Sequence, residues 1–99
     1  MSIIVVMAEL FPKEGKEEDL IPLAEALVEE TLKEEGNIDY KFLKSIKDNT
    51  FLFIEQWESK EALGQHMASP HLQLFSKESA DLAENMEIKV FGAEEVNLG

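Results

Sequence analysis

The chain has 99 residues, no cysteine and a formal net charge of −12, because 21 acidic residues outnumber nine lysines and there is no arginine. This length supports one hydrophobic core, so we expect a single domain over residues 1–99. Without cysteine there can be no disulfide, thiolate nucleophile or cysteine metal ligand, and a cytoplasmic location suits such a chain. The negative charge argues against nucleic acid and membrane surfaces as partners.

The missing arginine also limits which small molecules the chain can recognise. Bidentate binding of carboxylate or phosphate groups is the particular strength of the guanidinium group. A neutral or weakly polar ligand is therefore the class that this composition favours.

The first ten residues contain a short apolar run that is rich in β-branched side chains. It is too short to cross a bilayer, which takes about 20 residues, and it lacks the basic start of a signal sequence. We expect a strand from Ile3 to Leu10, followed by a loop over residues 11–15.

A helix is predicted next, with Asp19 as its N-cap and Pro22 in its first turn, where proline is tolerated. Core-facing positions recur at helical spacing, while glutamates lie largely on the opposite face. Gly36 supplies the stop signal. The core-facing positions are Leu20, Ala24, Leu27, Val28, Thr31 and Leu32.

Two strands and a connecting turn follow this helix. Alternating apolar residues predict a strand over residues 38–46 that ends with Ile46. Asp48 and Asn49 favour a hairpin turn over residues 47–50, because both tolerate the backbone angles of tight turns. The third strand is expected over residues 51–57.

Two serines mark the starts of two further helices. Ser59 is the expected N-cap of a short helix that ends near Met67. Ser69 and Pro70 fit the N-cap and first helical position of another, which is expected to continue to about Ala83. A last strand then contains Met86, Ile88 and Val90 in alternation, with Gly92 at a bulge or at the strand end.

The predicted order is β-α-β-β-α-β, the ferredoxin-like α+β arrangement. Right-handed crossovers place the helices on one face of an antiparallel sheet. The other face is also apolar, because Leu52 and Ile54 alternate with Phe51, Phe53 and Trp57. A second copy, packed sheet against sheet, covers such a face most simply, so we expect a homodimer.

Glu55 is a candidate for proton transfer. It shares one strand face with Phe53 and Trp57, and a carboxyl group among aromatic rings loses hydration, which raises its pKa. The alternative is a carboxylate at the sheet end, paired with a lysine or a backbone donor.

His66 and His71 are the two histidines, and they flank the break between the two C-terminal helices. An imidazole with a pKa of about 6.5 can accept a phenolic or enolic proton. The alternative is a structural role for each ring. Their spacing of five differs from the i, i+4 spacing of two metal ligands on one helix, so we expect no metal site, even with Glu55 available as a third ligand.

Common cofactor-binding motifs do not occur in the chain. It has no phosphate-cradling glycine loop, no dinucleotide fingerprint and no serine nucleophile elbow. We therefore expect no cofactor held through these motifs.

Four segments together resemble the antibiotic-biosynthesis-monooxygenase family, and within it the small bacterial quinol monooxygenases. They are Glu-Glu-Gly-Asn at 34–37, Phe-Ile-Glu-Gln-Trp-Glu-Ser at 53–59, His66, and Ser-Pro-His at 69–71. The resemblance implies a dimeric α+β barrel with a hydrophobic pocket between sheet and helices. It also implies oxidation of a quinol, phenol or enolisable small molecule by O2, without metal or flavin.

The same resemblance implies roles for individual residues. One histidine would be the base, with His66 preferred over His71, and Glu55 would orient it or accept a proton. The implied substrate-binding residues are Trp57, Phe53, Phe75 and Asn37.

Other relatives suggest other functions. Haem-degrading members ligate iron through a histidine at a position that corresponds to Ser76 here, which argues against haem degradation. A non-catalytic small-molecule-binding or stress-response dimer, or an isomerase, is the main alternative. Glu55 and a histidine converging on a cavity would favour the enzyme, whereas surface histidines or a closed pocket would favour the binding protein.

Overall fold

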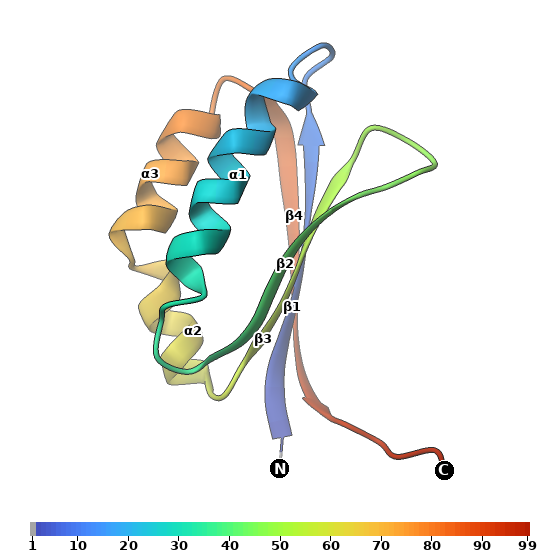
Figure 1. Ribbon diagram of the computed structural model, residues 1–99, viewed down its shortest axis with the longest axis vertical. Coiled ribbons are helices and arrows are strands. Elements are labelled where there is room, and N and C mark those ends of the chain that lie inside the picture. The colour runs from blue at the N-terminus through green and yellow to red at the C-terminus, as the bar shows by residue number, and fades with distance from the viewer. Residues whose placement is uncertain (1) are drawn as a thin grey trace.

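The chain folds into a four-stranded antiparallel sheet with three helices over residues 2–99, the part that the computed structural model describes. The elements are β1 (Ser2–Pro12), α1 (Glu17–Thr31), β2 (Asn37–Lys44), β3 (Phe51–Trp57), α2 (Lys60–Met67), α3 (Pro70–Ser79) and β4 (Ala83–Glu94). The strands are ordered β2-β3-β1-β4, and the helices lie on one side of the sheet (Figure 1). The predicted α+β, ferredoxin-like order is confirmed. Met1, the first residue of the predicted domain, lies outside the described residues.

The core lies between the helices and one face of the sheet. Successive side chains of a strand point to opposite faces, so the alternation in β3 decides which residues are buried. Phe51, Phe53, Glu55 and Trp57 are all buried beneath the helices, whereas Leu52 and Ile54 lie on the other face and stay partly exposed. The predicted apolar character of both faces of β3 is therefore confirmed.

The helical layer does not fully cover β4, which is an edge strand. Ile88 pairs with Ala8 and Val90 pairs with Val6, so these side chains face the same side of the sheet as the core. Ala8 and Val6 are buried, yet Ile88 and Val90 are each about half exposed. The helix-facing side of the sheet is thus accessible along β4.

Two serine hydroxyl groups cap the N-termini of the helices that carry the histidines. The Ser59 hydroxyl accepts a hydrogen bond from the backbone N–H of Ala62 at 3.1 Å, and the Ser69 hydroxyl accepts one from that of Leu72 at 3.3 Å. Both predicted N-caps are therefore confirmed. Ser69 also donates its hydroxyl hydrogen to the carbonyl of His66 at 2.7 Å, which joins the end of α2 to the start of α3.

The start of α1 differs from the prediction. The helix begins at Glu17 with Lys16 at the N-cap, so Asp19 lies within the first turn and Pro22 lies inside the helix. A tight turn explains the early start, because the N–H of Lys16 bonds to the carbonyl of Lys13 at 3.0 Å. Asp19 still favours the helix there, since a negative charge near the N-terminus complements the helix dipole.

The strand ends also differ at two places. β2 ends at Lys44, and Ile46 is fully exposed in the loop instead of closing the strand. The loop closes early because Ser45 N–H bonds to the Thr50 carbonyl at 2.9 Å, while Asp48 accepts hydrogen bonds from Thr50. The predicted turn lies within this loop, but the predicted strand is two residues too long.

The last helix and strand meet earlier than predicted. α3 ends at Ser79, and Ala83 begins β4 instead of ending the helix. The N–H of Leu82 bonds to the carbonyl of Ser79 at 2.9 Å, which closes a turn. Gly92 lies within β4 paired with Ile4, and the irregularity in this pairing falls at Pro12, which has no N–H to donate.

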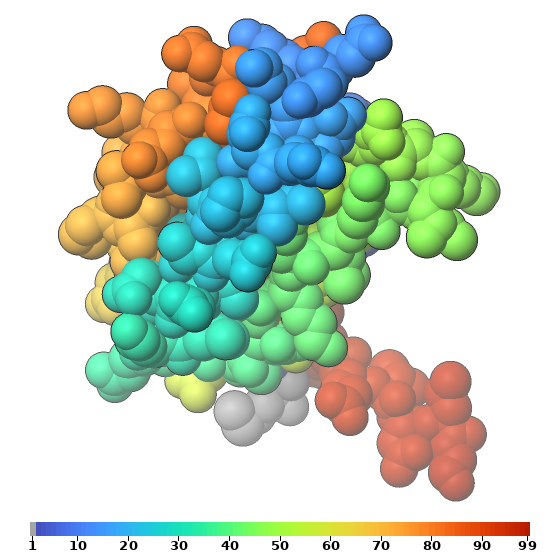
Figure 2. All heavy atoms as spheres, turned by 45° about the horizontal axis from the view of Figure 1, so that its top comes forward, coloured from blue at the N-terminus to red at the C-terminus, as the bar shows by residue number. Residues whose placement is uncertain are grey.

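Two further observations concern the outside of the molecule. Among the described residues, no helix covers the other face of the sheet (Figure 1), and Met7, Leu43 and Phe91 on that face are each 40% exposed or more. The C-terminal end projects from the body as an arm (Figure 2), on which Val96 and Leu98 are largely exposed. Among the described residues, no helix is both long and apolar enough to cross a membrane.

Candidate active site

A cavity of about 100 Å³ lies between the sheet and the helices. Its wall is mostly apolar, and the titratable side chains in it are those of Tyr40, Glu55 and His66. The remaining lining residues are Val6, Ala8, Leu27, Phe53, Met67, Leu72, Phe75, Ser76, Met86 and Ile88. A few polar groups in an apolar pocket are typical of a small-molecule site.

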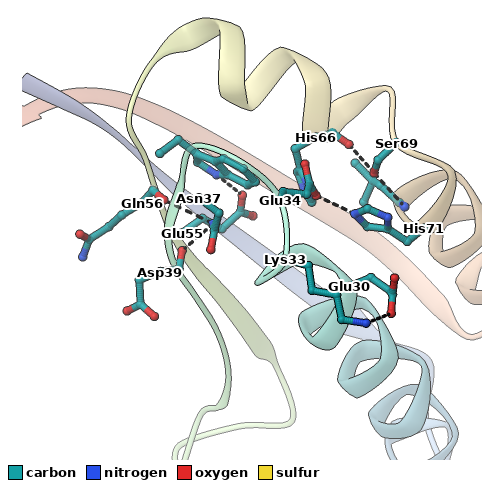
Figure 3. A network of polar contacts seen from close by, with 12 residues as sticks. Glu30, Lys33, Glu34, Asn37, Asp39, Glu55, Gln56, His66, Ser69 and His71 are labelled. Atoms are coloured by element: carbon teal, nitrogen blue, oxygen red, sulfur yellow. Dashed lines mark hydrogen bonds and ion pairs between the residues drawn. The ribbon is translucent and has the colours of Figure 1, made fainter.

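Glu34 lies between the two histidines (Figure 3), of which His66 lines the cavity. Its Oε2 atom is 2.7 Å from Nδ1 of His66 and 2.6 Å from Nε2 of His71. Glu34 lies in the turn after α1, His66 in the last turn of α2 and His71 in the first turn of α3. An ionised carboxylate only accepts hydrogen bonds, so both ring nitrogens are N–H donors.

This contact fixes the chemistry of the His66 ring. Burial lowers the pKa of His66, although the hydrogen bond and the charge of Glu34 oppose that shift. The ring is therefore neutral near pH 7, with its hydrogen on Nδ1 and a lone pair on Nε2. A buried, carboxylate-bound imidazole with a free lone pair can act as a general base.

Glu55 is held by its neighbour on the same strand. The indole Nε1–H of Trp57 donates to Oε1 of Glu55 at 3.0 Å. Burial raises the pKa of Glu55 to about 7, the negative charge of Glu34 adds to the rise, and the Trp57 hydrogen bond opposes it. Glu55 is thus a buried group that can give or take a proton near neutral pH, and its partner is an indole rather than a lysine or backbone donor.

Aromatic rings surround His66. Its ring centroid lies 4.7 Å from that of Trp57 and 5.3 Å from that of Tyr40. Phe53 and Phe75 meet nearly edge to face, with centroids 5.7 Å apart. These contacts limit how far the imidazole can turn, because buried rings of this size leave little free volume.

Four of the seven predicted site residues line the cavity, and three do not. His66, Glu55, Phe53 and Phe75 line the cavity. Trp57 lies behind His66 and Glu55, and His71 reaches the site through Glu34. The seventh, Asn37, faces the backbone, where its amide donates to the carbonyls of Asp39 and Gln56 at 3.2 and 3.4 Å.

Sequence reasoning missed two residues, Glu34 and Tyr40. Glu34 belongs to the segment 34–37 that resembles the family, but its partners lie 32 and 37 residues further along the chain. Tyr40 could have been found from strand alternation, since it pairs with Glu55 and so faces the core. Burial raises the pKa of Tyr40, so it remains a neutral hydroxyl able to donate a hydrogen bond.

Comparison with known proteins agrees with the resemblance seen in the sequence. The profile of the antibiotic biosynthesis monooxygenase family matches residues 3–78. An uncharacterized Synechocystis protein, sll1783, is 37% identical over 90 residues, which are 89% of this chain. The match spans 61% of that relative's length.

Two further relatives match over most of both chains. "Putative monooxygenase YcnE" of Bacillus subtilis is 31% identical over 81 residues, covering 81% of this chain and 85% of its own. The crystal structure of a conserved protein from Methanosarcina mazei Go1 superposes with a TM-score of 0.87 at 30% identity, covering 92% of each chain. The helices and sheet are thus arranged as in experimentally solved relatives.

Proposed function

Because the chain belongs to the antibiotic biosynthesis monooxygenase family, we propose that it oxidises a quinol, phenol or enolisable small molecule with O2 in this cavity. The observation that carries the proposal is the Glu34–His66 pair at 2.7 Å, in which the buried His66 lines the same cavity as the protonatable Glu55. The buried Glu55 and His66 favour an enzyme over a binding protein.

The first step is removal of a proton by His66. The lone pair on Nε2 accepts the acidic proton of the substrate, and the Glu34 carboxylate stabilises the imidazolium that forms. Tyr40 can donate its hydroxyl hydrogen toward the substrate anion, because it stays neutral. The protein therefore supplies the base and the polar contacts, while the substrate supplies the electrons.

The oxygen chemistry balances without an external reductant. The substrate anion gives its electrons to O2, a C–O bond forms, and His66 returns its proton to give a hydroperoxide. His66 then removes the remaining hydrogen on that carbon as the O–O bond breaks, and Glu55 protonates the departing hydroxide to give water. Glu55 is then reprotonated from His66. Overall, a CH2 carbon and O2 become a carbonyl group and water, so four electrons pass from carbon to oxygen.

The size and lining of the cavity restrict the substrate. Its volume of about 100 Å³ is below the roughly 150 Å³ of an apolar cavity that accepts benzene. A single-ring substrate therefore fits when Met86 and the half-exposed Ile88, both at the β4 side, move outward. We expect single-ring hydroquinones and catechols to be better substrates than fused-ring compounds.

Oxygen uptake with a panel of hydroquinones and polyphenols tests this function. A chelator is present throughout to suppress autoxidation by trace metals. Wild type is compared with His66→Gln and with the control Glu35→Gln, an exposed carboxylate next to Glu34. We expect uptake above the spontaneous rate, at least tenfold lower in the folded His66→Gln variant, which corresponds to about 1.4 kcal/mol of barrier.

Other outcomes contradict the proposal. Equal uptake by wild type and the His66→Gln variant would remove His66 as the base. No uptake across the panel, with saturable binding of the same compounds, would favour the non-catalytic binding protein.

A further inference from the structure

Glu34, His66 and His71 place three metal-ligating atoms together. One carboxylate oxygen and two imidazole nitrogens lie within 4.8 Å of one another. The side chains are mostly shielded from solvent, with exposed fractions of 14% for Glu34, 2% for His66 and 21% for His71. Two imidazoles and one carboxylate are a donor set that also occurs in zinc enzymes.

We propose that these three residues bind a divalent transition-metal ion. The proposal goes beyond the proposed oxidation, which uses the same histidine without a metal. It also replaces the expectation drawn from sequence spacing, which considered ligands on one continuous helix. His66 and His71 lie on two helices, α2 and α3, and the break between them lets a spacing of five converge on one point.

The donor atoms are close together but have to shift before they can hold one ion. Zinc bonds to histidine nitrogen and carboxylate oxygen measure about 2.0–2.2 Å, so tetrahedral donors lie roughly 3.3 Å apart. The Glu34 oxygen is now 2.7 and 2.6 Å from the two ring nitrogens. To reach tetrahedral spacing, the carboxylate oxygen has to move back by roughly 0.6 Å from each ring. The two ring nitrogens lie within 4.8 Å of each other and have to approach by up to roughly 1.5 Å. Glu34 lies in the turn beyond α1, so its side chain can rotate as the ion binds.

Neighbouring contacts keep both histidines close to Glu34. Ser69 bonds to the carbonyl of His66 and caps α3, which fixes the two helices relative to each other. The tilted ring of Trp57, with its centroid 4.7 Å from that of His66, limits the movement of the imidazole. A site whose ligands are preorganised loses less entropy when it binds an ion.

Access and charge also favour a cation. His71 and Glu34 retain some exposure, so an ion can reach the cluster from the surface. The net charge of −12 raises the local concentration of cations. Imidazole ligands select zinc, copper, nickel or iron over calcium and magnesium, which prefer sites made of oxygen atoms.

Metal binding and base catalysis are mutually exclusive at His66. An ion on Nδ1 forces the ring hydrogen onto Nε2, and that nitrogen can then no longer accept a proton from substrate. The two proposals are therefore tested on separate preparations, and failure of one leaves the other standing. Oxygen uptake is measured with chelator, and metal binding is measured without substrate.

Titration of the full chain with Co2+, followed by displacement with Zn2+, tests the site. Visible absorption of bound Co2+ reports its coordination, and calorimetry gives the stoichiometry. We expect one ion per chain, with nitrogen and oxygen ligands. The variants His71→Gln and Glu34→Gln should each weaken binding at least tenfold, and the control Glu35→Gln should leave it within twofold.

Two results would overturn the proposal. One is the absence of saturable Co2+ or Zn2+ binding to the wild-type chain. The other is equal weakening by Glu35→Gln and by His71→Gln, which would assign the binding to the acidic surface as a whole. Because His71 is partly exposed, we expect the His71→Gln variant to fold. Circular dichroism of this variant checks that the fold is retained.

Discussion

The two sides of the His66 ring face different surroundings, and these decide what the ring can do. On one side Glu34 accepts the hydrogen of Nδ1. On the other side the ring borders a cavity whose wall also contains Glu55 and Tyr40. The Glu34 carboxylate orients the proposed base, and the cavity supplies the space in which a substrate can meet it. This division of roles is the residue-scale basis for the proposed chemistry.

Glu55 gives a prediction for stability as a function of pH. Burial raises the pKa of Glu55 in the folded chain to about 7, above the ordinary glutamate value of 4.5, so the folded state binds more protons than the unfolded state between these values. Stability from this group is thus present at low pH and lost as pH rises through about 7. The loss amounts to roughly 3 kcal/mol. The titratable groups around Glu55 are Glu34, Tyr40 and His66.

Urea unfolding at pH 5 and pH 8.5 measures this effect. We expect the wild type to lose more stability between the two values than Glu55→Gln, whose amide still accepts from Trp57. Glu58→Gln is the matched control, since Glu58 is exposed on the same segment. Equal losses of stability between pH 5 and pH 8.5 in the wild type and in Glu55→Gln would contradict a raised pKa of Glu55.

At the scale of elements, the turn between α1 and β2 positions Glu34 against α2. Gly36 has φ of +87°, and a Cβ atom there would lie 2.5 Å from Cβ of Ala62. Gly15 also has a positive φ, of +79°, but a Cβ atom there would meet nothing within 4 Å. Comparing a substitution at Gly36 with one at Gly15 therefore distinguishes the cost of close packing from the cost of backbone strain.

Gly36→Ala is expected to destabilise the chain more than Gly15→Ala. A left-handed backbone costs a non-glycine residue about 1–2 kcal/mol, and overpacking at Gly36 adds roughly 1–3 kcal/mol. Chemical denaturation of both variants gives the difference in the free energy of unfolding. Equal destabilisation would mean that the turn adjusts freely and does not hold Glu34 in place.

Much of the fold, but less of the site, follows from the sequence. Alternation in β3 and the capping serines Ser59 and Ser69 are local signals, so they predict these elements well. The predicted end of β2 is wrong because Asp48 and Thr50 close the loop through contacts that hydrophobic alternation does not reveal. Glu34 was missed because its link to His66 arises only when the turn after α1 packs against α2.

At the scale of the whole molecule, the sheet face away from the helices supports the expected homodimer, because exposed apolar side chains lie on it. This face carries Met7, Leu43 and Phe91, each 40% exposed or more, beside the partly exposed Leu52 and Ile54. Removing apolar area of this kind from water lowers the free energy of the associated chains. A two-fold contact would bury the same patch on both copies.

Met7→Glu is expected to weaken the proposed dimer by introducing a charge on β1, one of the two central strands. Leu74→Glu is the control, because Leu74 is 54% exposed on α3, in the helical layer. Sedimentation equilibrium should find a dimer for the wild type and for Leu74→Glu, and a shift toward monomer for Met7→Glu. A monomeric wild type, or dissociation caused only by Leu74→Glu, would contradict this arrangement.

The most direct test of the central claim follows the oxygen atoms during turnover. The chelator-treated chain is given a single-ring substrate from the panel and isotopically labelled O2, and the product is examined by mass spectrometry. The proposed reaction predicts one labelled oxygen atom in the product carbonyl and one in water, with no hydrogen peroxide. An unlabelled product accompanied by an equal amount of hydrogen peroxide would contradict monooxygenation, because O2 would then act only as an electron acceptor.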